Sequence, residues 1–361
     1  MKMKKMNIHG IARKIVLPTI VSAVALLPFV SCSDAIYDEE GDCSVTYRIK
    51  FRYDLNLKWA DAFAGEVGSV RLYAFDDDNK LVWEGRERGS VLRDPGYTML
   101  LDLPAGRYHL IAWCGIDNET AQYEAFSVPE ATRGRTVPED LRCRLNRWTE
   151  DGSAYSSQRL EFMFHGEMDV LLPENEDGGE YTYTMPLTKD TNHIRVILQQ
   201  LSGEDLDVDK FDFRIEDSNG LYAHDNTLLP DEKITYLTWN KMTGTAGLGK
   251  DDIGESRAII YVNGAIADLT VGRMMADHAR DMILTITNDK GEKVARVPVI
   301  DYALLSKEYY EEAYGREMDE QEFLDREDEY VLTFFLDEDR KWISSSILIH
   351  SWRIVLQDIE L

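Results

Sequence analysis

One residue in the sequence, Cys32, has neighbours that favour a covalent modification. The chain opens with basic side chains at Lys2, Lys4, Lys5, Arg13 and Lys14. A largely apolar run, residues 15–30, follows them, which is the layout of an export signal. Ser31 places a small residue directly before the cysteine, as lipoprotein signal peptidase requires for cleavage and for diacylglyceryl transfer to the thiol. We therefore expect residues 1–31 to be a lipoprotein signal peptide and Cys32 to be the lipidated first residue of the mature protein.

Two other interpretations of this stretch stay open: an ordinary secretory signal in which Cys32 is incidental, or an uncleaved membrane span. The apolar run is shorter than the roughly 20 residues that cross a bilayer, and it contains Pro18 and Pro28. Phe29 stands where a lipobox usually carries leucine. A lipid on Cys32 would hold the protein on a membrane, because each buried methylene contributes about 0.8 kcal/mol.

The remaining residue types give no sign of catalysis. The seven histidines are scattered singly, at His9, His109, His165, His193, His224, His278 and His350. None lies in an HExxH motif, and the chain has no GxSxG, Walker or GxGxxG motif. Because a lone histidine on a strand is usually packed or solvated, we expect no catalytic, cofactor-binding or metal-binding residues and no enzyme activity.

Three acidic clusters, residues 76–78, 174–177 and 325–329, are expected to be solvated turns. Adventitious calcium binding is the alternative, but none of the clusters has the alternating oxygen ligands and trailing glutamate of an EF-hand. A carboxylate pair for glycoside hydrolysis would meet only in space, and nothing in the sequence points to one.

Three cysteines, Cys43, Cys114 and Cys143, remain after lipidation of Cys32. In an oxidising envelope one pair of them can form a disulfide, and the spacing does not choose the pair. No CxxC occurs, so neither a zinc ribbon nor a thioredoxin-like site is indicated. The formal net charge of -26 argues against nonspecific binding to nucleic acid or to an anionic bilayer.

Alternating apolar residues indicate many short strands. Residues 45–53 alternate throughout and predict a half-buried strand. Residues 70–75 and 81–83 flank a turn at 76–79 and predict a hairpin. Residues 97–103 and 107–113 flank Pro104, Ala105 and Gly106 and predict a second hairpin. Strands at this spacing favour a sandwich or barrel over a parallel sheet.

Short helices interrupt the predicted strands. Trp59 and Phe63, spaced i and i+4, predict a helix over residues 58–67. Two helical insertions are expected at 301–313 and 319–327, and Asp319 and Glu322 of the second have capping-box spacing. Further strands are expected at 141–145, 160–164, 181–187, 258–262, 282–287, 294–300, 330–336, 341–349 and 352–361.

The length of 361 residues favours two domains. An acidic stretch that contains Gly178 and Gly179 precedes a fresh run of strands, so we place the boundary near residue 188. The predicted organisation is a tether at 32–44, an N-terminal β-sandwich domain at 45–187 and a C-terminal β-sandwich domain at 188–361. The predicted fold is all-β, with short helical insertions.

Taken together, the chain resembles the FimB/Mfa-type fimbrial anchor lipoproteins of the transthyretin-like fimbrillin superfamily, found in Bacteroidales-type bacteria. Besides the lipobox and tether, the resemblance covers residues 51–63, 103–113, 269–275, 298–302 and 318–330. It implies two transthyretin-like β-sandwich domains and an outer-membrane lipoprotein that holds the base of a cell-surface fimbria. The implied partners are shaft subunits of the same superfamily. Only Cys32 carries over as a functional residue.

Two alternatives stay open beside the anchor. One is a surface glycan-binding or glycan-degrading lipoprotein, although most of the seven tryptophans lie in alternating or helical patterns that favour core packing. The other is a tip or shaft fimbrillin, which would share the fold. The lipid does not separate an anchor from a shaft subunit, because shaft precursors can be lipidated too.

The resemblance also carries an expectation about processing. Shaft subunits of the superfamily lose an N-terminal strand to an arginine-specific protease, and a neighbour's strand fills the groove. The same cut at Arg48 or Arg52 would separate Cys32 from both domains. We therefore expect both arginines to be protected in a paired strand. We also expect the contact with the shaft subunit to involve the second domain and its C-terminal strand.

Overall fold

The computed structural model describes residues 45–117, 124–174, 178–200, 202, 206–248, 260–349 and 352–356. Residues 44–361 form one compact unit. Cys32, the predicted tether and Cys43 lie outside the described residues. Within the described part of the chain, no helix is long and apolar enough to cross a membrane.

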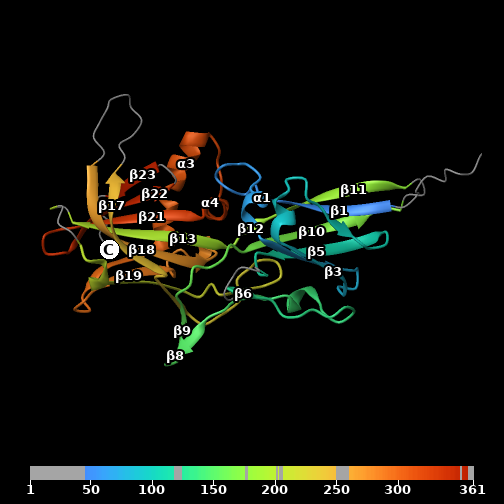
Figure 1. The fold of residues 1–361 in the computed structure, drawn as a ribbon, viewed down its shortest axis with the longest axis horizontal. Helices are drawn as coiled ribbons and strands as arrows, with labels where there is room; N and C mark the ends of the chain where they lie inside the picture. The colour runs from blue at the N-terminus through green and yellow to red at the C-terminus, as the bar shows by residue number, and fades with distance from the viewer. Residues whose placement is uncertain are drawn as a thin grey trace, which may run out of the picture. The chain divides into compact units, whose positions relative to one another are not determined.

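Two sheets build a first sandwich (Figure 1). One has the order β11 (Gly179–Pro186), β1 (Val45–Arg52), β4 (Met99–Leu101). The other has the order β12 (Thr188–Lys189), β10 (Phe164–Leu172), β5 (Gly106–Cys114), β2 (Ser69–Phe75), β3 (Leu81–Arg88). The predicted first strand is confirmed: it runs parallel to β11 and antiparallel to β4, and buries Tyr47, Ile49 and Phe51 on one face.

The two predicted hairpins have different outcomes. Strands β2 and β3 pair antiparallel around the turn at 76–79, as predicted. The second hairpin is wrong, because β4 pairs with β1 whereas β5 pairs with β2 and β10. The segment Pro104 to Gly106 therefore carries the chain from one sheet to the other. Both flanking segments are apolar enough to enter either sheet, so their pattern does not specify which strand each one joins.

Two larger sheets build a second sandwich (Figure 1). The first has the order β17 (Asn240–Leu248), β18 (Ile260–Gly272), β13 (Thr191–Gln200), β21 (Glu329–Leu336), β22 (Trp342–Ile349), β23 (Trp352–Leu356). The second has the order β20 (Lys293–Pro298), β19 (Ile283–Asn288), β14 (Phe211–Asp217), β16 (Ile234–Leu237), β9 (Ser153–Ser156), β8 (Trp148–Glu150). A small sheet joins β15 (Leu221–Tyr222), β7 (Cys143–Leu145) and β6 (Phe126–Ser127).

The chain connects the sandwiches more than once. Strands β8 and β9 precede residue 188 yet extend a sheet of the second sandwich, through parallel pairing of β9 with β16. Strand β12 follows residue 187 yet pairs with β10 of the first sandwich. The predicted domain boundary near residue 188 stays a prediction.

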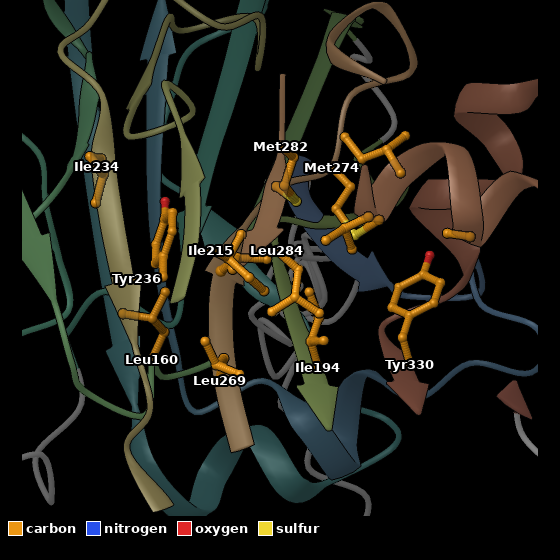
Figure 2. Packing of buried hydrophobic residues seen from close by; sticks show 14 of the residues in the cluster. Leu160, Ile194, Ile215, Ile234, Tyr236, Leu269, Met274, Met282, Leu284 and Tyr330 are labelled. Atoms are coloured by element: carbon orange, nitrogen blue, oxygen red, sulfur yellow. The ribbon is translucent and has the colours of Figure 1, made fainter. Parts of the chain in front are cut away.

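Two clusters of buried apolar side chains hold these layers together. The first lies between the sheets of the first sandwich and includes Phe51 of β1 and Leu72 of β2. The second fills the second sandwich, where Ile194, Ile215 and Leu284 are fully buried (Figure 2). This cluster continues onto Tyr73, on the opposite face of β2 from Leu72. Each buried side chain of this size contributes about 1.5–3 kcal/mol.

The α-helices are short: α1 (Phe63–Glu66), α2 (Val299–Leu304), α3 (Lys307–Tyr314) and α4 (Glu320–Arg326). The 3-10 helices are η1 (Gly89–Arg93), η2 (Pro138–Asp140), η3 (Val208–Lys210) and η4 (Ala276–His278). The predicted helix at 58–67 is too long, because Trp59 has a left-handed backbone with φ of 52°. The predicted insertion at 301–313 is two helices that meet near Ser306. The Asp319 side chain accepts a hydrogen bond from the Glu322 amide, so the predicted N-cap is confirmed.

Candidate functional site at the junction of the two sandwiches

The predicted lipid site, Cys32, lies outside the described residues, so it stays a prediction. In the described part of the chain, some of the histidines that are isolated in the sequence lie beside carboxylates. His109 is 2.8 Å from Asp169 and 3.0 Å from Glu167, and His278 is 3.6 Å from Asp217. Among the described residues, no group of three or more His, Cys, Asp or Glu side chains is arranged to hold a metal ion.

The two described cysteines, Cys114 and Cys143, are buried free thiols. Burial raises the pKa of both thiols, which keeps them protonated and unreactive. Of the three pairs that the sequence left open, the pair Cys114–Cys143 is therefore not formed.

The acidic cluster at 325–329 is not the solvated turn that the sequence predicts. The side chains of Asp325 and Glu327 are buried, with 9% and 1% exposed. Asp328 pairs with Lys189 of β12. The cluster connects α4 to β21 at the contact between the two sandwiches, and its cationic partners are remote in the sequence. We call this contact, formed by residues 54–60, Glu66 and Lys189 with α3, Arg316, α4 and Asp328, the junction.

The first part of the junction is an aromatic ring in contact with two cations. The Trp59 ring faces the guanidinium of Arg326 at 3.6 Å and that of Arg316 at 4.0 Å from its centroid. Cation–π contacts contribute about 0.5–2 kcal/mol each, the larger values applying where water is excluded. The left-handed backbone of Trp59, which costs an L-residue about 1–2 kcal/mol, is held in place by these contacts.

Hydrogen bonds to the backbone groups of the same loop join it to the helices of the second sandwich. The Leu57 amide donates to the Arg326 carbonyl at 3.1 Å, and the Tyr310 hydroxyl donates to the Leu57 carbonyl at 2.7 Å. The Arg326 guanidinium donates to the carbonyl of Asp54 at 3.2 Å. Because buried backbone groups need partners, these bonds specify one docking of the loop on the helices.

A buried ammonium group forms a third part of the junction. The Lys189 side chain is 2% exposed, and its Nζ lies 2.9 Å from the Glu66 carboxylate and also bonds Asp328. The same Nζ lies 3.5 Å from the centroid of the Phe162 ring. A buried cation with two carboxylate partners is strongly destabilised when one partner is removed, by about 3–5 kcal/mol.

A buried polar network adjoins the junction inside the second sandwich. Asp325 receives two hydrogen bonds from Arg273, at 2.8 and 2.7 Å. Asp190 is fully buried, and its carboxylate accepts a 2.8 Å hydrogen bond from the side-chain amide of Asn226. Burial raises the pKa of Asp190 to about 7, and the nearby Arg273 opposes this rise. The network holds α4 on the end of β18 and so orients the residues of the junction.

The sequence predicts none of this junction. Lys189 and Asp190 stand out only as two charges between strand-forming segments, which is the one signal that could have drawn attention to them. Their partners are distant in the chain: Glu66 precedes Lys189 by 123 positions, Asp328 follows it by 139, and Asn226 follows Asp190 by 36.

One family of known proteins matches nearly the whole chain. The family of fimbrillin-A associated anchor proteins Mfa1 and Mfa2 matches residues 39–358. The chain belongs to this family. The resemblance to Mfa-type fimbrial anchors is therefore confirmed, and the family is one of structural anchor proteins, not of enzymes.

Comparisons of this Mfa2-family chain with individual relatives support the same family and the same fold. The minor fimbrium anchoring subunit Mfa2 of Porphyromonas gingivalis is 25% identical over 247 residues, which are 67% of this chain and 71% of that protein. A candidate adhesin of Bacteroides thetaiotaomicron is 31% identical, with a TM-score of 0.72 over 88% of this chain and 100% of that one. The structure of Mfa2 from P. gingivalis, 18% identical, has a TM-score of 0.59 over 87% of this chain and 99% of that one. The all-β sandwich fold is confirmed.

Proposed function

We propose that this fimbrial anchor-type protein is lipidated at Cys32, stands on the outer membrane at the cell surface, and holds the base of a fimbria through strand-mediated contacts with the first shaft subunit. The observation that carries the proposal is the family match across residues 39–358, which begins seven residues after Cys32 of the predicted lipoprotein signal. No cofactor is needed for this role.

The position of β1 supports attachment through the N-terminus. A lipid on Cys32 reaches the sandwiches only through β1, which lies between β11 and β4 and is the central strand of its sheet. Arg48 pairs with Thr182 on one side and Leu100 on the other, and its guanidinium lies 2.5 Å from Glu180. Proteases bind extended, unpaired chain, so pairing on both sides protects this arginine.

The contacts of the junction support a role in transmitting tension. An anchor that is held at Cys32 and pulled through its second sandwich transmits the tension across the junction. The contacts of Trp59, Leu57 and Lys189 lie in different parts of the junction and would share this load.

The last described strand supports a shaft contact in the second sandwich. Strand β23 lies at the edge of its sheet and pairs with β22 alone among the described strands. An edge strand presents unpaired backbone N–H and C=O groups to which another chain can add a strand.

Affinity isolation tests the proposal. The full-length protein is solubilised from cells in detergent, captured with an antibody against residues of the second sandwich, and its partners are identified by mass spectrometry. Fimbrial subunits of the same superfamily are the expected partners, and a variant that lacks residues 352–361 is expected to lose them. Isolation of the folded protein without any fimbrial subunit would contradict the proposal.

A further inference from the structure

One edge of the first sandwich is open beside the junction, and the proposed anchoring function does not use it. On one side, β10 pairs with β5 along its whole length (Figure 1). On the other side it pairs with β12 at Phe164 and His165. The chain before β12 belongs to the other sheet, because the Leu187 amide donates to the Arg52 carbonyl of β1 at 2.8 Å. From Gly166 onward, no described strand pairs with this edge of β10.

The main-chain groups of two residues of β10 face this open edge. Along a strand, these groups point to alternate sides. Just before β10, the Met163 carbonyl bonds on this side to the amide of the residue that follows β12, at 2.8 Å. Glu167 and Asp169 are separated from Met163 by an even number of positions, so their N–H and C=O groups point the same way. The open length ends at Leu171, whose carbonyl accepts a 2.6 Å hydrogen bond from the Tyr183 hydroxyl.

The two faces beside the open edge differ in character. Glu167 and Asp169 lie on the outer face, where His109 is 3.0 Å from the first carboxylate and 2.8 Å from the second. Met168 and Tyr183 lie on the inner face, partly buried against the apolar cluster between the two sheets. A strand added to this edge would therefore meet carboxylates on one face and apolar side chains on the other.

A groove of about 360 Å³ adjoins the open edge. Its walls carry three carboxylates, those of Asp54, Glu167 and Asp225. Asp54 is paired with Arg52 at 2.8 Å. Asp225 is exposed, and its carboxylate accepts a 2.7 Å hydrogen bond from the neutral hydroxyl of Thr227. The cation in the walls, Arg273, is 12% exposed and bonds to α4. The groove is therefore suited to a cationic side chain.

We propose that the open edge of β10 binds an extended segment of a partner protein, with basic side chains at two alternate positions and an apolar residue between them. The segment pairs antiparallel with β10, as β12 does, and its main chain bonds to Glu167 and Asp169. Its basic side chains then lie on the outer face, beside the carboxylates of the edge and the groove. Its apolar residue packs on Met168 and Tyr183. A second copy of this chain, with a net charge of -26, would be repelled.

Ligand-observed NMR with detergent-solubilised full-length protein tests the proposal. The first probe is the capped pentapeptide TKVKT, and TEVET is its charge-reversed counterpart. A third peptide is TKVKT with a methyl group on the main-chain nitrogen of each lysine, which keeps the charge and removes the donors. We expect TKVKT to bind roughly tenfold more tightly than either counterpart. No binding of TKVKT, or equal binding of its methylated form, would overturn the proposal.

Two substitutions at one position separate strand pairing from charge. Asp169→Ala removes a carboxylate that is 83% exposed and keeps the N–H at the open edge. Asp169→Pro also removes that N–H, which points away from β5, so the pairing with β5 is kept. We expect the proline variant to bind TKVKT roughly tenfold more weakly than the alanine variant. Equal affinities of the two folded variants would refute strand addition. If the proline variant does not fold, the methylated peptide decides the same question.

A further pair of variants tests the role of the groove. Asp225→Asn should weaken the binding of TKVKT several fold, whereas Asp289→Asn, at an exposed turn of the second sandwich, should bind like the parent. Unchanged affinity of Asp225→Asn would contradict recognition by charge. Sedimentation of the parent gives the remaining check. Self-association that Asp169→Pro abolishes would assign the edge to a second copy and overturn our choice of partner.

Discussion

The hydroxyl of Tyr310 donates a 2.7 Å hydrogen bond to the carbonyl of Leu57, 253 positions earlier in the chain. The amide of Leu57 donates to Arg326 at 3.1 Å, so both backbone groups of this buried residue find their partners on the helices of the second sandwich. One loop residue thereby fixes how the loop at 54–60 docks on α3 and α4.

Removing this hydroxyl should destabilise the protein. In Tyr310→Phe the Leu57 carbonyl loses its partner in a buried setting, and we expect the free energy of unfolding to fall by about 1–2 kcal/mol. Urea denaturation of the detergent-solubilised protein measures this change. Tyr309→Phe is the control, because Tyr309 is 55% exposed. Equal midpoints for the two variants would show that the bond contributes nothing.

Two substitutions of Trp59 separate the contribution of its ring from the cost of its left-handed backbone. Trp59→Ala loses the ring between Arg316 and Arg326 and keeps a side chain in the left-handed region, and should cost about 2–4 kcal/mol. Trp59→Gly loses the same ring and relieves the backbone, so it should be more stable than the alanine variant by about 1 kcal/mol. Thermal unfolding gives the order. An alanine variant as stable as the glycine variant would contradict the left-handed geometry.

Stability should depend on pH through Glu327. Burial, together with the charge of Asp328, raises the pKa of Glu327 from the ordinary value of 4.5 to about 8 in the folded protein, although the hydrogen bonds from the amides of Glu329 and Asp328 oppose this rise. The folded state thus holds a proton that the unfolded state has released between about pH 4.5 and pH 8, and the stability from this group falls as pH rises through that window. Asp190, with a pKa of about 7, acts in the same direction.

Glu327→Gln should therefore lose less stability than the parent between pH 5 and pH 8. The difference in slope is at most about 1.4 kcal/mol per pH unit. His165, whose pKa is lowered to about 4, changes stability in the opposite direction below pH 6.5, but both proteins share it. Glu320→Gln, at an exposed position of α4, is the control. Parallel curves for parent and Glu327→Gln would refute the role of this carboxyl.

Sequence reasoning reaches different parts of this molecule to different degrees. Alternation identifies β1 because its pairing buries one face, and the local turn at 76–79 identifies the hairpin of β2 and β3. Strand β5 pairs with β2 and β10, and not with β4 as the predicted hairpin required. Which sheet a strand joins depends on the packing of the whole fold, so the local sequence pattern does not predict it. The acidic cluster at 325–329 looks solvated because its partners, among them Lys189, are distant in the chain. Pairs such as Leu57 and Tyr310 exist only once the sandwiches have formed.

The arginines of β1 should resist an arginine-specific protease. Arg48 pairs on both sides, and Arg52 pairs with Pro186 of β11. Arg133, exposed in a turn, provides an internal control and should be cut first. N-terminal mapping of the protein from intact filaments is expected to find lipidated Cys32. A major species that begins at Ile49 or Tyr53 would refute the idea.

The fate of filaments in a Cys32→Ala strain tests the anchoring account most directly. Cells that carry this variant and cells that carry Cys43→Ala are compared by immunoblot of fimbrial subunits in the cell and medium fractions, and lipid labelling with a palmitate probe reports the modification. We predict that Cys32→Ala abolishes the label and sheds filaments into the medium while total filament protein changes little, and that Cys43→Ala behaves like the parent. Filaments that stay on Cys32→Ala cells would contradict the account.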